Sequence, residues 1–147
     1  MSDAAIHLLV GTTKGAFVLD GDADRTHWEV RGPYCDGWSV NHVIGDRVTG
    51  RMWAGGGGDW SGAGVWRSGD SGRTWELTRL TSGEMDAWAA DDPGFAESIG
   101  WTEGPVPFGD GFSQVWSLGR VGGRLYAGTK PATLLVSDDD GVTWEAV

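Results

Sequence analysis

The sequence of 147 residues carries a formal net charge of −10, with 21 Asp and Glu against 11 Lys and Arg. Binding to a phosphate backbone requires clustered Lys and Arg, so we expect no nucleic-acid partner. Cys35 is the single cysteine, which excludes a disulfide within one chain and gives no sign of an oxidising compartment.

The composition indicates an all-β protein. The chain contains 26 Gly and 10 Trp, and it has no apolar run long enough for a membrane span or an amphipathic helix. We therefore expect no membrane partner. The N-terminal apolar stretch is too short for a signal peptide and lacks a basic leader, which predicts a cytoplasmic protein.

The predicted elements form three similar units in chain order. HLLVGT at 7–12 matches RMWAGG at 51–56 and RLYAGT at 124–129, and each match precedes another apolar strand. We place the units at 6–31, 39–79 and 114–147. About four strands in roughly 40 to 50 residues is the size of a propeller blade. The expected fold is a partial β-propeller of about three four-stranded antiparallel meanders, of which the first has three strands.

An eight-residue motif, Ser-x-Asp-x-Gly-x-Thr-Trp, occurs at 68–75 and again at 137–144. Its Asp can accept backbone N–H bonds across a tight turn, and its Gly can adopt positive φ. The Trp is expected to anchor the turn on the sheet. These structural positions are Ser68, Asp70, Gly72, Thr74, Trp75, Ser137, Asp139, Gly141, Thr143 and Trp144. A degenerate copy retains Asp22, Thr26 and Trp28.

A long insertion separates the second unit from the third, at 81–112. We expect a loop of about thirty residues, and loops of that length are usually functional or disordered. Meander geometry places it on one face of the disc with the connections near Lys14, at 31–38 and at 55–64. The insertion alternates acidic and aromatic residues: Glu84, Asp86, Trp88, Asp91, Asp92, Phe95, Glu97, Trp101, Glu103 and Asp110.

Aromatic rings with acids between them suit a carbohydrate site, because sugar C–H faces stack on rings and sugar hydroxyls need hydrogen-bond partners. The expected ligand-binding residues are Tyr34, Trp38, His42, Trp60, Trp88, Trp101 and Lys130, and the candidate catalytic carboxylates are Asp36, Asp59 and Asp86. For each residue singly, packing or solvation is the simpler interpretation. We expect no metal, because the histidines lack ligand spacing, and no cofactor. The three consecutive Asp residues at 138–140 are explained by the turn motif that contains them, without a metal ion.

Beyond these motifs, the chain resembles the sialidase-like BNR-repeat family, whose repeat contains the Asp-box turn. The matching text is LLVGTTKGAFVL, VRGPYCDGWSVNHV and RLYAGTKPATLLVSDDDGVTWE. The likeness covers nearly the whole chain and is to the N-terminal part of propellers about twice as long, often labelled exo-sialidase or glycosyl hydrolase. The resemblance implies a propeller fold and a glycan-related function.

The sequence departs from the catalytic pattern of sialidases, which hold the substrate carboxylate with three arginines and use a Tyr nucleophile. The Phe-Arg-Ile-Pro-like motif is missing, and only Arg31, Arg79 and Tyr34 are expected on the insertion face. Similar propellers include inverting xyloglucan hydrolases, receptors and assembly factors. Two hypotheses remain open: a module that binds a glycan or protein on this face, or a glycoside hydrolase that uses paired carboxylates there.

Three blades are too few to close a ring, because closed propellers usually have about four to eight. The sequence therefore predicts a homo-oligomer or a part of a longer propeller chain, since large uncovered apolar faces do not stay monomeric. Two copies would supply six blades.

Overall fold

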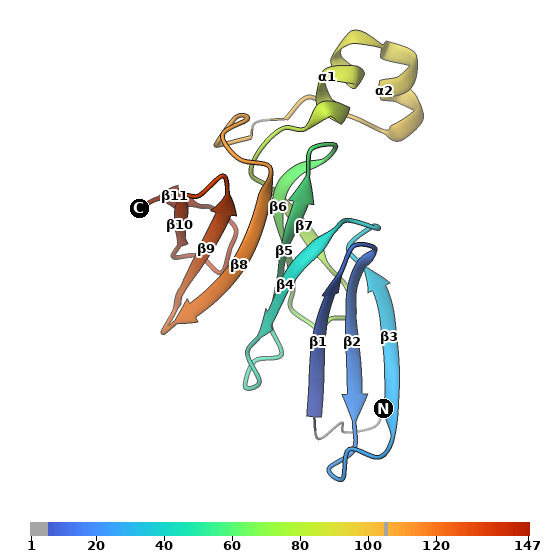
Figure 1. Cartoon of the computed structure of the whole chain (residues 1–147), viewed down its shortest axis with the longest axis vertical. Helices are drawn as coiled ribbons and strands as arrows, with labels where there is room; N and C mark the ends of the chain where they lie inside the picture. Colours follow the sequence, from blue (N-terminus) through green and yellow to red (C-terminus); the bar gives the residue numbers. More distant parts are fainter. Residues whose placement is uncertain (1–5, 105) are drawn as a thin grey trace.

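The structure, a computed structural model, describes residues 6–104 and 106–147. The described chain is built from antiparallel strands that form curled sheets, with two short helices at one end (Figure 1). The all-β prediction is therefore confirmed for the body of the molecule. Within the described residues, no helix combines the length and apolar character needed to cross a membrane.

The first sheet contains three strands in chain order, β1 (Ile6–Thr12), β2 (Gly15–Gly21) and β3 (Trp28–Tyr34). Leu9 pairs with Val18 and Val18 with Arg31, so these side chains share one face. The neighbouring pairs Leu8 with Leu19 and Leu19 with Val30 point to the opposite face. The sheet extends to Tyr34, three residues beyond the predicted end of the first unit.

Two four-stranded meanders follow. The first consists of β4 (Val40–Gly45), β5 (Met52–Gly58), β6 (Gly62–Ser68) and β7 (Glu76–Arg79); the second consists of β8 (Gln114–Val121), β9 (Arg124–Lys130), β10 (Leu134–Ser137) and β11 (Glu145–Ala146). A single pair, Gly57 with Gln114, joins β5 to β8 and makes one curled eight-stranded sheet. We call β4–β7 the second sheet and β8–β11 the third sheet, because this one pair is their only strand pairing in the described chain.

The core lies between successive sheets. Ala16, Val40, Val43, Ala54 and Trp66 form a buried cluster between the first and second sheets. A larger cluster between the second and third sheets contains Trp53, Val65, Leu118, Leu125, Ala127, Leu135 and Trp144, among others. Near-continuous apolar strands are explained by this stacking, because the second sheet is covered on both faces.

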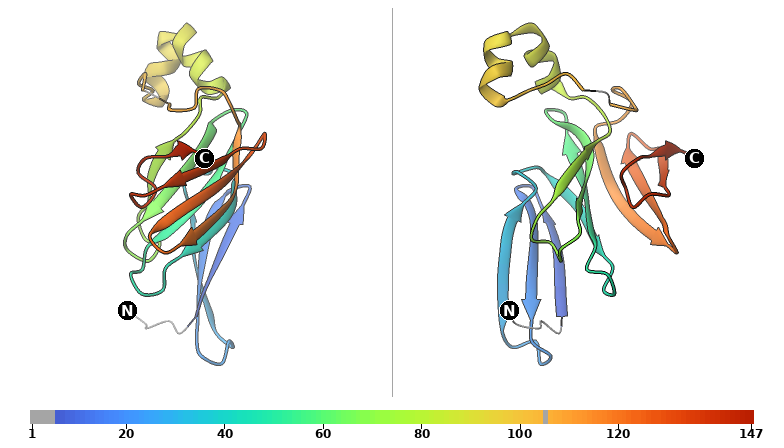
Figure 2. Two further views of the ribbon diagram at one scale, coloured as in Figure 1. Left: turned by 90° about the vertical axis from the view of Figure 1, so that its left-hand side faces the viewer. Right: turned by 180° about the vertical axis from the view of Figure 1, so that it is seen from behind.

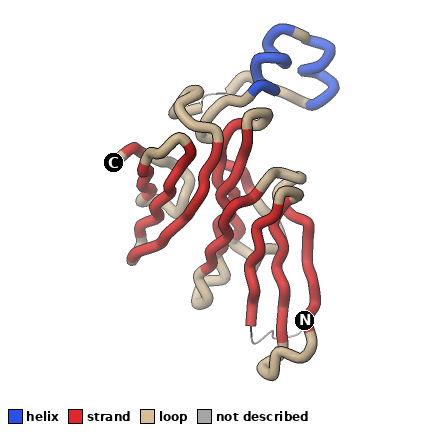
Figure 3. Tube along the Cα trace, in the orientation of Figure 1, coloured by secondary structure: helices blue, strands red, loops and turns tan. Residues whose placement is uncertain are grey.

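The 81–112 insertion is not the irregular loop that the sequence predicts. It contains α1 (Glu84–Asp91) and α2 (Pro93–Ile99), the only helices in Figure 3. The side chain of Asp92 accepts hydrogen bonds from the backbone N–H groups of Gly94 and Phe95 and starts α2, and Pro93 suits the first helical position. Gly100 ends α2 in the left-handed conformation.

Both eight-residue turns fold in the same way. The Asp70 carboxylate accepts the Thr74 N–H at 2.9 Å and the Thr74 hydroxyl at 2.6 Å, and Asp139 does the same with Thr143. The Trp75 Nε1–H donates to the Gly72 carbonyl at 2.9 Å, as Trp144 does to Gly141 at 3.0 Å. The motif is therefore a self-contained hydrogen-bonded turn.

The degenerate copy retains most of this geometry. The Asp22 carboxylate accepts the N–H of Thr26 at 2.8 Å and its hydroxyl at 2.9 Å. The Trp28 Nε1–H donates to the Arg25 carbonyl three residues before it, at 3.3 Å. The Asp, Thr and Trp are therefore sufficient to preserve the turn without the motif's Ser and Gly.

Candidate functional site

The helical insertion lies at one end of the molecule, and the β2–β3, β4–β5 and β8–β9 turns lie at the other (Figures 1 and 2). The backbone N–H of Glu84 donates to the Asp59 carbonyl at 2.8 Å, and that of Met85 donates to the Trp60 carbonyl at 2.9 Å. The start of α1 is therefore fastened to the β5–β6 turn. We call this part of the molecule the insertion end.

A pocket of about 570 Å³ lies between the insertion and the sheets. Three carboxylates line it, those of Asp59, Glu84 and Asp110. None of the three makes a hydrogen bond or ion pair in the described part of the chain. The remaining lining is small or apolar and comes from Gly58, Ser82, Gly83, Ala87, Gly111, Phe112, Ser113 and Pro131. The pocket is therefore acidic, with acceptor groups available to a ligand.

Three aromatic side chains meet at the insertion end. Trp60, Trp88 and Phe95 come from the β5–β6 turn, α1 and α2, and their ring centroids are 6.0 to 6.3 Å apart in edge-to-face arrangements. Trp60 is 46% exposed and Trp88 62% exposed. Trp60 follows Asp59 in the chain and Trp88 follows Ala87, so the aromatic cluster adjoins two residues of the pocket lining. Two broad indole surfaces therefore remain open to solvent.

Asp86 and Trp101, both predicted site residues, hold the insertion together. Arg79 donates two hydrogen bonds to the Asp86 carboxylate, at 2.9 and 2.6 Å, and the Trp101 Nε1–H donates a third at 2.9 Å. The Gly83 N–H donates a fourth at 2.8 Å. Burial opposes ionisation of Asp86, but these bonds outweigh it and lower its pKa to about 2. A carboxyl with so low a pKa is ionised at neutral pH and has no proton to donate there, which argues against Asp86 as a general acid.

Three predicted site residues lie at the end of β3 and in the link that follows it. Asp36 is exposed, with φ at +50°. Trp38 packs edge-on against Trp66 at 5.6 Å, and Tyr34 lies 6.3 Å from Trp75. Neither aromatic belongs to the cluster at Trp60. Cys35 is buried beside them, and burial raises the pKa of its thiol to about 12, so the thiol is unreactive.

His42 lies on β4 of the second sheet, and Lys130 is the last residue of β9 in the third sheet. The His42 Nδ1 accepts a hydrogen bond from the Leu118 backbone N–H at 2.9 Å. This bond links β4 to β8 and occupies the Nδ1 atom. The Lys130 ammonium lies 5.1 Å from the ring of exposed Trp116. The Trp116 Nε1–H donates to the Gln114 side chain at 3.0 Å. The residue after Lys130, Pro131, lines the acidic pocket, whereas Lys130 does not.

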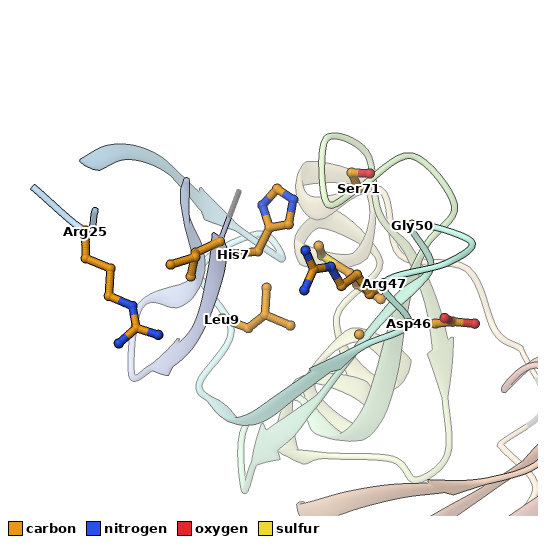
Figure 4. A pocket seen from close by; sticks show the side chains of 10 residues that line it. His7, Leu9, Arg25, Asp46, Arg47, Gly50 and Ser71 are labelled. Carbon is orange, nitrogen blue, oxygen red and sulfur yellow. The ribbon is translucent and has the colours of Figure 1, made fainter. Parts of the chain in front are cut away.

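A second pocket, of about 500 Å³, lies between β1 and the β4–β5 turn, away from the insertion. His7 and Arg47 project into it, and Asp46 points away (Figure 4). His7 is paired with Asp20 at 2.7 Å, and Asp46 with Arg120 at 3.1 Å. The first pair lies within the first sheet, between β1 and β2, and the second joins the β4–β5 turn to β8.

The structure thus brings Asp59, Trp60 and Trp88 together and places Asp36, Trp38 and His42 elsewhere. The sequence places Glu84 and Asp110 in the insertion but does not mark them as site residues. It also does not identify the pocket residues Ser82, Phe112 and Ser113. These three residues flank the two junctions where the insertion leaves and rejoins the sheets, and that position is the signal that could have identified them. Within residues 6–104 and 106–147, no three His, Cys, Asp or Glu side chains are arranged to hold a metal ion.

The sequence matches none of the protein-family models with which it was compared. No curated protein shows significant similarity to it either.

Proposed function

We propose that this chain is a glycan-binding module of the sialidase-like Asp-box propeller type, which binds a neutral saccharide at its insertion end. The propeller assignment is supported by three stacked meanders, each with an Asp–Thr–Trp turn between its last two strands. The functional assignment is carried by one observation: three unpaired carboxylates line a pocket, and two exposed tryptophans, Trp60 and Trp88, directly follow lining residues Asp59 and Ala87 in the chain.

Each part of this site matches a need of a sugar ligand. Carboxylates accept hydrogen bonds from sugar hydroxyls, and the indole faces of Trp60 and Trp88 can stack on sugar C–H surfaces. A concave pocket with a few polar groups beside aromatic walls is the usual form of a small-ligand site. The same carboxylates would repel an anionic ligand, because Asp59, Glu84 and Asp110 present like charge. The site is therefore better suited to neutral saccharides than to sialosides.

The test is calorimetric titration with chitotetraose and cellotetraose, with sialyllactose as the anionic comparison. We expect binding of a neutral saccharide that Trp60→Ala weakens by about tenfold, or about 1.4 kcal/mol. Trp28→Ala is the matched control, since Trp28 is an exposed indole on the first sheet, and it should leave affinity unchanged. Equal losses in both variants, or no binding of any neutral saccharide, would contradict the proposal.

Glycoside hydrolysis is the second candidate, favoured by the same three carboxylates. An inverting enzyme needs two carboxyl groups about 6.5 to 9.5 Å apart, with one protonated. Asp59 and either Glu84 or Asp110 are the residues that could form such a pair. Turnover of neutral fluorogenic glycosides that Asp59→Asn abolishes, with folding intact, would favour the enzyme. Saccharide binding without turnover would favour the module.

A further inference from the structure

Two opposite faces of the molecule are apolar and uncovered. On the first sheet, Leu8, Val10, Phe17, Leu19 and Val30 point away from the second sheet; none is buried, and Leu8 and Val30 are 49% and 61% exposed. We call them the leading face. On the third sheet, Tyr126 and its strand partner Val136 point away from the second sheet, as does Leu134, which is 47% exposed. We call these three residues the trailing face. The second sheet lies between the two (Figure 1).

The contacts inside the chain show what kind of surface each face fits. At the first contact, Leu9 of β1 and Met52 of β5 pack around Gly45, where an added Cβ would lie 3.1 Å from the Leu9 side chain and 3.4 Å from that of Met52. At the second, Trp53 of β5 and Leu125 of β9 pack around Gly141, where an added Cβ would lie 3.3 Å from each side chain. In each contact, a side chain of one sheet (Leu9 or Trp53) lies near the side chain that is one alignment position earlier on the next sheet (Met52 or Leu125). The two glycines are not equivalent, because Gly72, the counterpart of Gly141, lies near Met52 and Val18.

The sequence alignment of the units extends this series. Leu9, Trp53 and Tyr126 occupy one position of HLLVGT, RMWAGG and RLYAGT, and Leu8, Met52 and Leu125 occupy the position before it. The chain uses the pairs Leu9 with Met52 and Trp53 with Leu125. The two positions left unmatched are Tyr126 on the trailing face and Leu8 on the leading face. They correspond to the two alignment positions that meet at the internal contacts.

The solvent-exposed area of a single chain is consistent with a contact between copies that one copy alone lacks. The chain exposes 8390 Å², whereas a compact monomer of 15.6 kDa is expected to expose about 7,200 Å². Two copies that each bury about 1,000 Å² would bury about 2,000 Å² in total, which is sufficient for a stable dimer.

We infer that the trailing face of one copy packs on the leading face of a second copy, with Tyr126 of each copy against Leu8 of the other. Two such head-to-tail contacts close a pair and place six sheets around one axis. This inference does not depend on the proposed saccharide site.

Size-exclusion chromatography with light scattering tests it on the 147-residue chain. We expect a mass twice the 15.6 kDa of one chain, and a single-chain mass for Leu8→Asp and for Tyr126→Asp. Val48→Asp is the control, because Val48 is 94% exposed in the β4–β5 turn and should leave the dimer intact. A folded single chain, or open-ended aggregates, in the unmodified protein would overturn the inference.

Cysteine cross-linking keeps the test decisive if an Asp variant fails to fold. A mixture of Leu8→Cys and Tyr126→Cys chains should form a disulfide-linked pair, and buried Cys35 should not compete. Leu8→Cys alone should not cross-link to itself. Self-linking of Leu8→Cys without linking to Tyr126→Cys would mean that like faces meet, and would refute the head-to-tail arrangement.

Discussion

Asp22, Asp70 and Asp139 occupy equivalent places in three turns and perform the same task. Each accepts the backbone N–H and the hydroxyl of a Thr four residues later. The hydrogen bonds from Thr lower the pKa of each carboxyl to about 2. The negative charge of these residues is therefore part of the fold rather than of a binding site.

This arrangement predicts acid sensitivity. Asp22, Asp70, Asp86 and Asp139 have folded-state pKa values of about 2 against an ordinary value of 3.8. A depressed pKa means that the stabilisation is fully present above about pH 4 and is lost as the pH falls towards 2. Urea midpoints measured over this range should fall steadily, and Asp139→Asn should reduce the dependence. A midpoint that stays constant down to pH 2 would contradict these assignments.

At the scale of single residues, the sequence predicts hydrogen bonds between near neighbours in the chain but not those between residues far apart in it. The turn motif is recognisable because all of its partners lie within eight residues. Asp86 is not recognisable as a structural residue, because Arg79 lies seven positions before it and Trp101 fifteen positions after it. Its carboxylate resembles a catalytic candidate in the sequence, and only the fold brings those donors to it.

Among the elements, the two complete turn motifs hold their glycines, Gly72 and Gly141, in the left-handed conformation, with φ at +82° and +89°. Gly72 has φ at +82°, and a Cβ there would lie 3.0 Å from both the Met52 sulfur and a Val18 methyl. The turn therefore packs directly beneath the first sheet. Its neighbour Gly69 has no atom within 4 Å of the equivalent position.

Gly72→Ala should consequently destabilise the protein by about 1–2 kcal/mol from the left-handed backbone alone, with crowding of Met52 and Val18 adding to the loss. Gly69→Ala should change the free energy of unfolding by less than about 0.5 kcal/mol. Urea denaturation of the two variants gives the comparison. Similar losses in both would show that crowding and backbone conformation at Gly72 do not matter.

The insertion helices show where sequence patterns fail for an element. α1 and α2 have eight and seven residues, which is too short for a helical period to stand out from alternating acids and aromatics. Their stability comes from contacts with the β5–β6 turn, from the Asp92 cap and from the Trp60, Trp88 and Phe95 cluster. Only the last of these could be suspected from composition, because aromatic residues are dense in this segment.

Across the whole molecule, the repeat explains the order of the sheets, and the insertion explains why one end differs from the other. The site predicted from the sequence is a broad face from Tyr34 to Lys130. The proposed saccharide site is smaller: the pocket lined by Asp59, Glu84 and Asp110, with the exposed indoles of Trp60 and Trp88 on neighbouring residues. Residue type could not reveal this, because exposed and packed tryptophans look alike in a sequence: Trp53 is buried, whereas Trp88 is open.

The most direct test of the proposed saccharide site is an NMR titration that follows the indole N–H signals of the tryptophans during addition of chitotetraose or cellotetraose. We expect the Trp60 and Trp88 signals to move with ligand, whereas those of the core residues Trp53 and Trp66 stay in place. Signals that never move, or that move only for Trp28 on the first sheet, would contradict a saccharide site at the insertion end.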